Sequence, residues 1–219
     1  MIYFKDIIGL IFPNKCPVCG ELSGKDGICL GCRNELDGKY YPHTIWAESF
    51  GKYIYRGISL FPYDEDDVKK MLFSVKMRGN RSAVSYFSSK AADGIMLSKE
   101  LLSCDVITFV TRRKSAEREN GYDQGKLYTD ELSRLTGIKN LTLLKRKIFR
   151  ISKEQKGLSK SEREENVKGA FYVSGDVKGK RILLFDDVVT TGASTGECAR
   201  VLLESGAKRV YVLCIASKL

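Results

Sequence analysis

The segment RILLFDDVVTTGAS, residues 181–194, holds the residue types best suited to chemistry. An apolar strand is expected to end on two carboxylates, Asp186 and Asp187, and a short loop then opens a helix. Backbone N–H groups at a helix N-terminus, together with the helix dipole, bind phosphate. Glycine lets a ligand approach the backbone closely, and hydroxyl side chains add hydrogen-bond donors. The expected phosphate loop therefore consists of Thr190, Thr191, Gly192, Ala193 and Ser194.

The two carboxylates suit another part of the same ligand. Asp186 and Asp187 repel phosphate, but they accept hydrogen bonds from vicinal sugar hydroxyls or help to hold Mg²⁺. A phosphate loop beside them indicates a ribose 5-phosphate, with the two aspartates as the catalytic residues. The alternative is a plain turn before a capped helix. The segment resembles the phosphoribosyl diphosphate (PRPP) loop of type I phosphoribosyltransferases, and the chain contains neither GxxxxGK[ST] nor GxGxxG.

Four cysteines near the N-terminus form two CxxC pairs separated by nine residues. Each pair can place two thiolates on one tetrahedral Zn²⁺, so the pattern predicts a structural zinc site without an open position. Disulfides or redox chemistry are the alternatives. The expected ligands are Cys16, Cys19, Cys29 and Cys32. The other three cysteines lie in or beside apolar runs and are expected in the core: Cys104, Cys198 and Cys214.

Hydrophobic periodicity predicts the elements that position these residues. Apolar runs predict strands at residues 105–110, 140–144, 181–185 and 209–216. Helical spacing predicts helices at residues 64–77, 82–102, 121–135 and 192–204. A strand, a helix and a strand in close succession at the C-terminal end indicate a right-handed βαβ unit and a parallel sheet. The expected fold is α/β, with a parallel sheet flanked by helices and a small cysteine module before it.

Composition limits the class of protein. The chain has 219 residues and is 43% hydrophobic, so it can bury a core, and its formal charge of +10 suits a polyanionic partner or a phosphorylated ligand. No apolar run reaches the roughly 18 residues that span a bilayer, so we expect a soluble protein without membrane insertion. The first 12 residues are interpreted as a short helix or strand rather than a signal peptide. Seven cysteines without an export signal favour the cytoplasm.

Several segments, in order along the chain, resemble those of the ComF family. They are FPNKCPVCG (residues 12–20), FPYDEDDVKKMLFSVKMRGN (61–80), NGYDQGKLYTDEL (120–132) and NVKGAF (166–171). This family combines a zinc ribbon with a type I phosphoribosyltransferase-like domain and is associated with natural competence and DNA uptake. The resemblance covers nearly the whole chain. It implies a zinc ribbon over residues 1–40 and a phosphoribosyltransferase-like domain over residues 41–219.

The resemblance also implies a pyrophosphate site after the first strand of that domain. The matching segment follows the strand expected at residues 105–110, and three cations there suit a diphosphate. A solvated charge run is the alternative. The implied pyrophosphate-binding residues are Arg112, Arg113 and Lys114.

A basic stretch, Lys145–Lys168, carries nine basic and four acidic residues and is expected to be a mobile loop. It corresponds to the loop that closes over PRPP in type I phosphoribosyltransferases and excludes water there. It equally suits a surface for single-stranded DNA.

The residues and the resemblance to the ComF family together imply two functions. One is a competence protein that handles single-stranded DNA in the cytoplasm with a PRPP-binding fold, and its implied partners include the competence helicase and recombination-loading proteins. The other is a Mg²⁺-dependent phosphoribosyltransferase that joins ribose 5-phosphate to an acceptor. No general base and no acceptor site stand out in the sequence.

Overall fold

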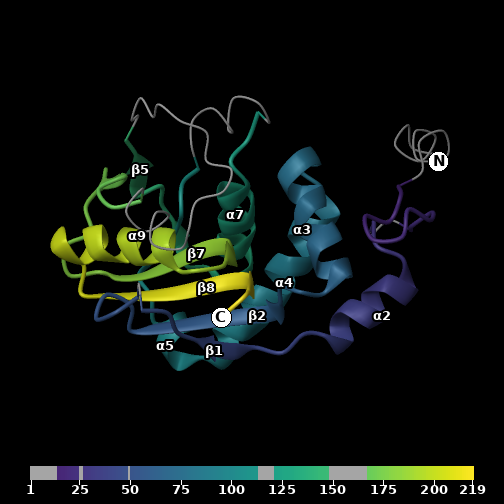
Figure 1. The fold of residues 1–219 in the computed structure, drawn as a ribbon, viewed down its shortest axis with the longest axis horizontal. Helices are drawn as coiled ribbons and strands as arrows, with labels where there is room; N and C mark the ends of the chain where they lie inside the picture. The colour runs from purple at the N-terminus through teal and green to yellow at the C-terminus, as the bar shows by residue number, and fades with distance from the viewer. Residues whose placement is uncertain (1–13, 25–26, 49, 113–120, 148–166) are drawn as a thin grey trace.

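The computed structural model describes residues 14–24, 27–48, 50–112, 121–147 and 167–219. Its centre is a six-stranded sheet with the order β1-β2-β8-β7-β3-β4 (Figure 1). Neighbouring strands run parallel, except that β1 pairs antiparallel with β2 at one edge. The strands are β1 (His43–Ile45), β2 (Arg56–Pro62), β3 (Val106–Phe109), β4 (Lys139–Asn140), β7 (Arg181–Val189) and β8 (Arg209–Ser217).

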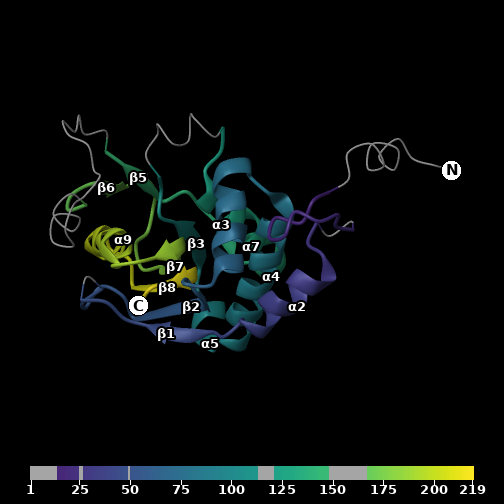
Figure 2. The same ribbon diagram turned by 45° about the vertical axis from the view of Figure 1, so that its right-hand side comes forward.

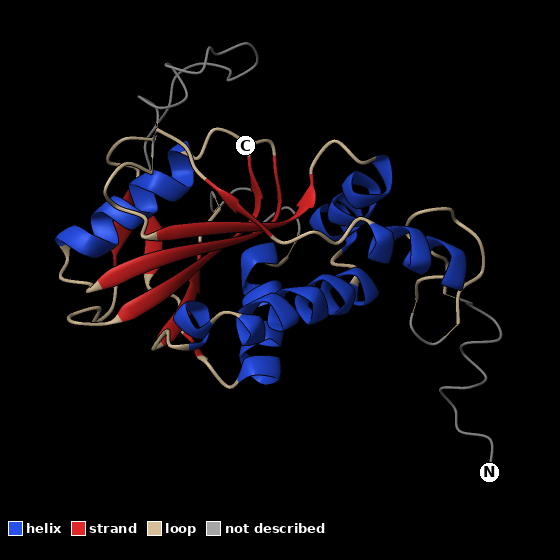
Figure 3. Cartoon of the chain, turned by 90° about the horizontal axis from the view of Figure 1, so that it is seen from below, coloured by secondary structure: helices blue, strands red, loops and turns tan. Residues whose placement is uncertain are grey.

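Two further strands, β5 (Leu144–Arg146) and β6 (Phe171–Val173), form an antiparallel pair outside the sheet. The helices described are α2 (Leu30–Gly38), α3 (Asp66–Arg78), α4 (Arg81–Leu97), α5 (Lys99–Leu102), α7 (Gln124–Thr136) and α9 (Ala193–Glu204). Helices cover both faces of the sheet, with α9 on one side and α4, α5 and α7 on the other (Figures 1, 2 and 3).

Successive side chains of the central strands point alternately into two separate hydrophobic cores. In β7, Leu183 and Phe185 face the cluster built with α3, α4 and α7, whereas Ile182 and Leu184 face the cluster built with α9 and the β5–β6 pair. Successive side chains of a strand point to opposite faces, so a strand covered on both sides is apolar throughout. This explains why β7 and β8 read as continuous apolar runs.

Local sequence fixes the helix ends. Asp123 accepts hydrogen bonds from the backbone N–H groups of Gly125 and Lys126 and so caps α7. Asn80 caps α4 through the N–H of Ala83. Gly79 ends α3 with φ of 59°, a left-handed conformation that glycine adopts without strain.

The predicted fold class is confirmed. The predicted helices also lie at the expected positions, except that one of them is divided into two helices. Ser98 interrupts the second helical stretch and caps α5 through the N–H of Leu101. The predicted strand at residues 140–144 is wrong as one element, because Asn140 ends β4 in the large sheet whereas Leu144 begins β5 in the small one. Strand β7 also runs beyond the predicted end, to Val189.

The cysteine module packs on the helices of the main body. Leu36 of α2 is fully buried in the same core cluster as α3 and α4. Lys39 forms ion pairs of 2.8 Å with both Glu65 and Asp67 at the start of α3. Asp37 accepts a hydrogen bond of 2.8 Å from the Tyr86 hydroxyl. The proposed boundary at residue 40 stays a prediction, and the element expected within residues 1–12 lies outside the described residues.

The remaining cysteines confirm the expectation of a core role, since Cys104, Cys198 and Cys214 are all buried. Burial raises the pKa of the Cys214 thiol to about 12, so that thiol is protonated at neutral pH. These three side chains behave as small apolar residues.

Candidate functional site

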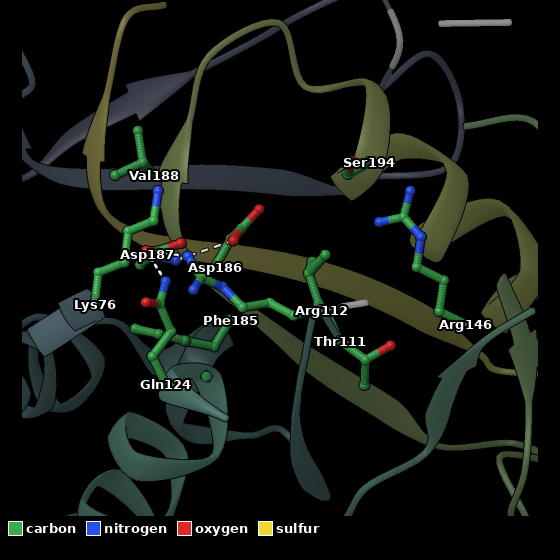
Figure 4. Close-up of a pocket in the computed structure, with 12 residues that line it drawn as sticks. Lys76, Thr111, Arg112, Gln124, Arg146, Phe185, Asp186, Asp187, Val188 and Ser194 are labelled. Atoms are coloured by element: carbon green, nitrogen blue, oxygen red, sulfur yellow. Dashed lines mark hydrogen bonds and ion pairs between the residues drawn. The ribbon is translucent and has the colours of Figure 1, made fainter. Parts of the chain in front are cut away.

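A cleft of about 400 Å³ lies at the carboxyl ends of β3 and β7 (Figure 4). Ligands of parallel α/β sheets commonly bind at this edge. The residues that line it are Lys76, Val110, Thr111, Arg112, Gln124, Gly125, Arg146, Phe185, Asp186, Asp187, Val188 and Ser194. The structure thus brings together four residues expected from the sequence: Arg112, Asp186, Asp187 and Ser194. Arg113 and Lys114 lie outside the described residues.

The two aspartates leave β7 in different directions. Asp186 accepts a hydrogen bond of 3.1 Å from the Thr195 hydroxyl of α9. Asp187 accepts a hydrogen bond from Gln124 of α7, and its carboxylate lies 4.0 Å from the Arg112 guanidinium. Alternation along the strand produces this divergence. The two carboxylates therefore connect the two helix layers, and both line the cleft.

Burial and the neighbouring charge of Asp187 raise the pKa of Asp186 well above its usual value. The folded protein therefore favours the protonated form of Asp186. A bound cation or a hydroxyl donor would favour the carboxylate form instead.

The loop before α9 has the form expected of an anion site. Gly192, the N-cap residue of α9, adopts φ of 75°. Because glycine has no side chain, it does not accept a hydrogen bond from the backbone N–H groups of the first turn. The N–H of Ala193 reaches the Thr191 hydroxyl at 3.4 Å. Ser194 lines the cleft directly, on the same side as Arg146 of β5 (Figure 4). Thr190 lies at the exposed end of β7, next to this turn.

Sequence reasoning missed Gln124, which is only 3% exposed at the start of α7. Its amide nitrogen donates to Asp187, whereas its carbonyl oxygen is buried without a hydrogen-bond partner in the described structure. Thr111 also has a buried hydroxyl without a partner there. One feature of the sequence could have indicated Gln124. It directly follows a helix-capping residue, Asp123, at the start of a helix that comes after a strand.

Asp123 joins the start of α7 to the segment after β3. Its carboxylate accepts a hydrogen bond of 3.5 Å from the backbone N–H of Arg112 and one of 2.8 Å from the N–H of Gly125. Burial raises the pKa of Asp123, although these N–H groups and the Arg112 charge oppose the shift. Lys76 of α3 and Arg146 of β5 add positive charge to the cleft, and neither was expected there. Arg146, assigned to the basic loop from the sequence, belongs instead to a strand.

The four N-terminal cysteines come together in the structure. Their sulfur atoms all lie within 4.8 Å of one another, and the sulfurs of Cys19 and Cys29 are 3.7 Å apart. A tetrahedral Zn²⁺ with Zn–S bonds of about 2.3 Å needs sulfurs about 3.8 Å apart. The donor set and its spacing therefore fit zinc, with no room for a further ligand in a four-thiolate site.

Hydrogen bonding already prepares one of these thiols for a metal. Burial raises the pKa of Cys16, but three backbone N–H groups outweigh it and lower the pKa to about 7. For Cys32, burial and the neighbouring thiols raise the pKa far above its usual value. Four thiols this close together cannot all ionise, because the negative thiolates repel one another. A bound metal cation compensates this charge and allows all four to ionise.

Comparison with known proteins finds no matching family model. Competence protein F of Haemophilus influenzae is 32% identical over 99 residues, 44% of this chain and 43% of that protein. DNA utilization protein YhgH of Escherichia coli is 40% identical over 70 residues, 32% of this chain and 31% of that protein. Competence protein ComFC of Streptococcus pneumoniae is 29% identical over 198 residues, 89% of this chain and 82% of that protein. The chain is thus similar to two proteins named for competence and to one named for DNA utilization.

The match to the first two of these proteins is partial, since the chain spans less than half of the length of either. Among solved structures, a purine phosphoribosyltransferase from Pyrococcus horikoshii has a TM-score of 0.41 and 21% identity, covering 60% of this chain and 74% of that one. Orotate phosphoribosyltransferase from Aeropyrum pernix has a TM-score of 0.39 and 20% identity, covering 70% and 67%. In the described part of the chain, every helix is too short or too polar to cross a bilayer.

Proposed function

We propose that the protein binds a ribose 5-phosphate ligand, with PRPP as the fullest match, in the cleft at the end of β7. The observation that carries this proposal is the position of Asp186 and Asp187 between the start of α9 and Arg112. The 5-phosphate would lie on Thr190–Ser194, the sugar hydroxyls at the two aspartates, and the pyrophosphate toward Arg112–Lys114. Oxygen ligands from the aspartates suit Mg²⁺, which would neutralise the diphosphate.

Calorimetry with PRPP and Mg²⁺ tests the ligand. Wild type is expected to bind, and the double variant Asp186→Ala/Asp187→Ala is expected to lose binding. A control at Asp176, an exposed acid beyond β6, should leave binding unchanged when it is replaced by alanine. Equal binding by the double variant would reject the role of the two carboxylates.

The biological role we propose is handling of single-stranded DNA during DNA uptake, in the cytoplasm. The names of the relatives support it, and the net charge of +10 suits a polyanion. The competence helicase and recombination-loading proteins are the expected partners. A direct test is the affinity of the purified protein for an oligonucleotide at several salt concentrations. Absence of binding near physiological salt would exclude direct DNA handling.

The alternative role is a phosphoribosyltransferase. In that reaction an acceptor forms a bond to C1 of the ribose, the bond from C1 to the pyrophosphate oxygen breaks, and pyrophosphate leaves. Release of pyrophosphate from PRPP, with and without DNA, separates the two roles. Turnover that requires a small acceptor and no DNA would favour the enzyme.

We further propose that the four-cysteine cluster holds one structural Zn²⁺. The spacing of the four sulfurs supports this assignment. Elemental analysis of protein purified under reducing conditions should give about one zinc per chain, and folded protein without metal would contradict the proposal.

A further inference from the structure

A second hollow, of about 500 Å³, lies beside the cleft, between α3 and the ends of β2 and β7. We call it the α3 groove, and the residues that define it are Tyr63, Lys69, Lys70, Phe73 and Lys76. Lys76, Arg112 and Asp187 line both the groove and the cleft, so the two hollows are continuous. The roles discussed so far use Arg112 and Asp187, but they do not use Tyr63, Lys69, Lys70 or Phe73.

Phe73 is an aromatic residue that the fold does not need. The inward face of α3 buries Val68, Met71 and Val75 completely, whereas Phe73 is 61% exposed on the opposite side. Met77, one turn further along, is 51% exposed. An exposed aromatic ring on a helix that already has a complete core face is available for a partner.

Cations lie close to the aromatic residues of the groove. Lys69 lies 5.8 Å and Lys218 lies 4.9 Å from the centre of the Tyr63 ring. Lys70 is exposed one turn before Phe73. Asp66 offsets part of this charge through an ion pair of 3.6 Å with Lys69. The groove is therefore positively charged and partly aromatic, and two lysines lie close to the ring of Tyr63.

This combination identifies the chemistry of the occupant. Single-stranded nucleic acids bind to aromatic side chains that stack on unpaired bases and to cations that follow the phosphates. A small anion would leave Phe73 unused, and an apolar peptide would leave the lysines unused. In a duplex the base faces are stacked on each other and cannot reach a side chain on an open helix surface.

We propose that the α3 groove binds single-stranded DNA, with a base stacked on Phe73 and phosphates beside Lys69 and Lys70. The inference rests on the proposed function in DNA handling and gives it a surface within the described structure. It differs from the expectation that the basic loop Lys145–Lys168 is the DNA surface. The continuity with the cleft places the bound strand next to the ribose-phosphate site.

Fluorescence anisotropy with a labelled 20-nucleotide oligo(dT) tests the groove, using the full chain loaded with zinc. Phe73→Ala is expected to weaken binding about 10-fold, since loss of one stacked base typically costs that much or more. Phe73→Tyr keeps the ring and should restore the affinity. Lys69→Ala/Lys70→Ala should reduce the slope of log affinity against log salt by about 1.4, because each phosphate contact on a single strand contributes about 0.7.

Matched controls lie away from the groove. Leu97, at the end of α4, is 84% exposed, and Leu97→Ala removes comparable apolar surface. Lys139 begins β4 and Lys208 directly precedes β8, both at the amino edge of the sheet. Lys139→Ala/Lys208→Ala therefore removes the same charge at a distant site. Both controls should bind as wild type does. Thermal unfolding of each variant verifies that the fold is intact.

The outcomes separate the inference from the proposed function. If wild type binds the oligonucleotide while the Phe73 and Lys69/Lys70 variants behave like their controls, the groove is not the DNA surface and the proposed function stands. If wild type does not bind, the proposed function itself fails. If Phe73→Ala weakens binding of a duplex as much as binding of the single strand, stacking on Phe73 is wrong.

Discussion

The side-chain amide of Gln124 donates a hydrogen bond to Asp187, and this contact joins the start of α7 to the end of β7. The other atom of the amide, the carbonyl oxygen, is buried without a partner in the described structure. Buried polar atoms usually have a partner, so an unpaired acceptor at the cleft is suited to a donor on a ligand or to a water molecule. Gln124 thus orients Asp187 and offers an acceptor of its own.

Replacing Gln124 should therefore weaken ligand binding through Asp187. Gln124→Leu removes the donor and leaves the carboxylate unsupported, so we expect PRPP to bind about 10-fold more weakly, the usual size for loss of one hydrogen bond to a charged group. Calorimetry measures the change. Lys126→Gln, on the exposed side of the same helix, is the control, and unchanged binding by Gln124→Leu would mean that Asp187 needs no support.

Asp186 should make the folded protein less stable at neutral pH than at acid pH. The pKa of Asp186 in the folded protein lies above the ordinary value of 3.8, so folding favours the protonated form. The stability that this protonated form provides is fully present below pH 3.8 and is lost as the pH rises through the raised pKa. Each unit of difference corresponds to about 1.4 kcal/mol. Asn carries no charge, so Asp186→Asn is expected to unfold at a higher temperature than wild type at pH 7.

Thermal unfolding without added Mg²⁺, at pH 3.5 and pH 7, checks this expectation for Asp186→Asn. The gain in stability should shrink at the lower pH, where the wild-type acid is protonated as well. The same variant should bind PRPP with Mg²⁺ more weakly, because a neutral amide is a poorer ligand for a cation. A variant that is less stable at both pH values would show that the carboxylate is well accommodated in the folded protein.

The proposed zinc site should control the stability of the part of the protein that contains α2. Cys16 and Cys32 lie in the same core cluster as Leu36, so loss of the metal disturbs packing as well as coordination. We expect a chelator, or Cys32→Ser, to lower the unfolding temperature. PRPP binding in the cleft at the end of β7 should change little at temperatures where the protein remains folded. Loss of ligand binding in folded, metal-free protein would give the metal a more direct role.

The sequence predicted the elements that are long and regular, because periodicity reports which face of an element is buried. It located β7, β8 and α9 within a few residues, since both cores demand apolar side chains there. It did not predict the buried strand β2, the short strands β1 and β6, or the helix α2. These elements are held mainly by neighbours distant in sequence, as the contacts of Lys39 with Glu65 and Asp67 show.

The site was predictable where one segment carries it and hidden where several segments meet. Asp186 and Asp187 stand next to their loop in the sequence, so the sequence already indicated them as site residues, and both line the cleft. Gln124, Lys76 and Arg146 reach the same cleft from three other elements, and only the packing of α7, α3 and β5 reveals this. The position of β4 and β5 in separate sheets depends on similar long-range pairing, which a single run of residues does not encode.

Gly125 should be essential for the approach of α7 to the sheet. A Cβ atom at this position would lie 2.8 Å from the ring of Phe109 and 3.1 Å from its Cβ, and Phe109 is itself buried in β3. Overpacking of this kind costs about 1–3 kcal/mol, so Gly125→Ala should unfold at lower denaturant concentration. Because Gln124 is the neighbouring residue, the displaced helix start should also weaken PRPP binding. Gly38→Ala, at the open end of α2, meets nothing within 4 Å and should not destabilise the protein. Equal stability of the two variants would show that the start of α7 can move away from β3 without cost.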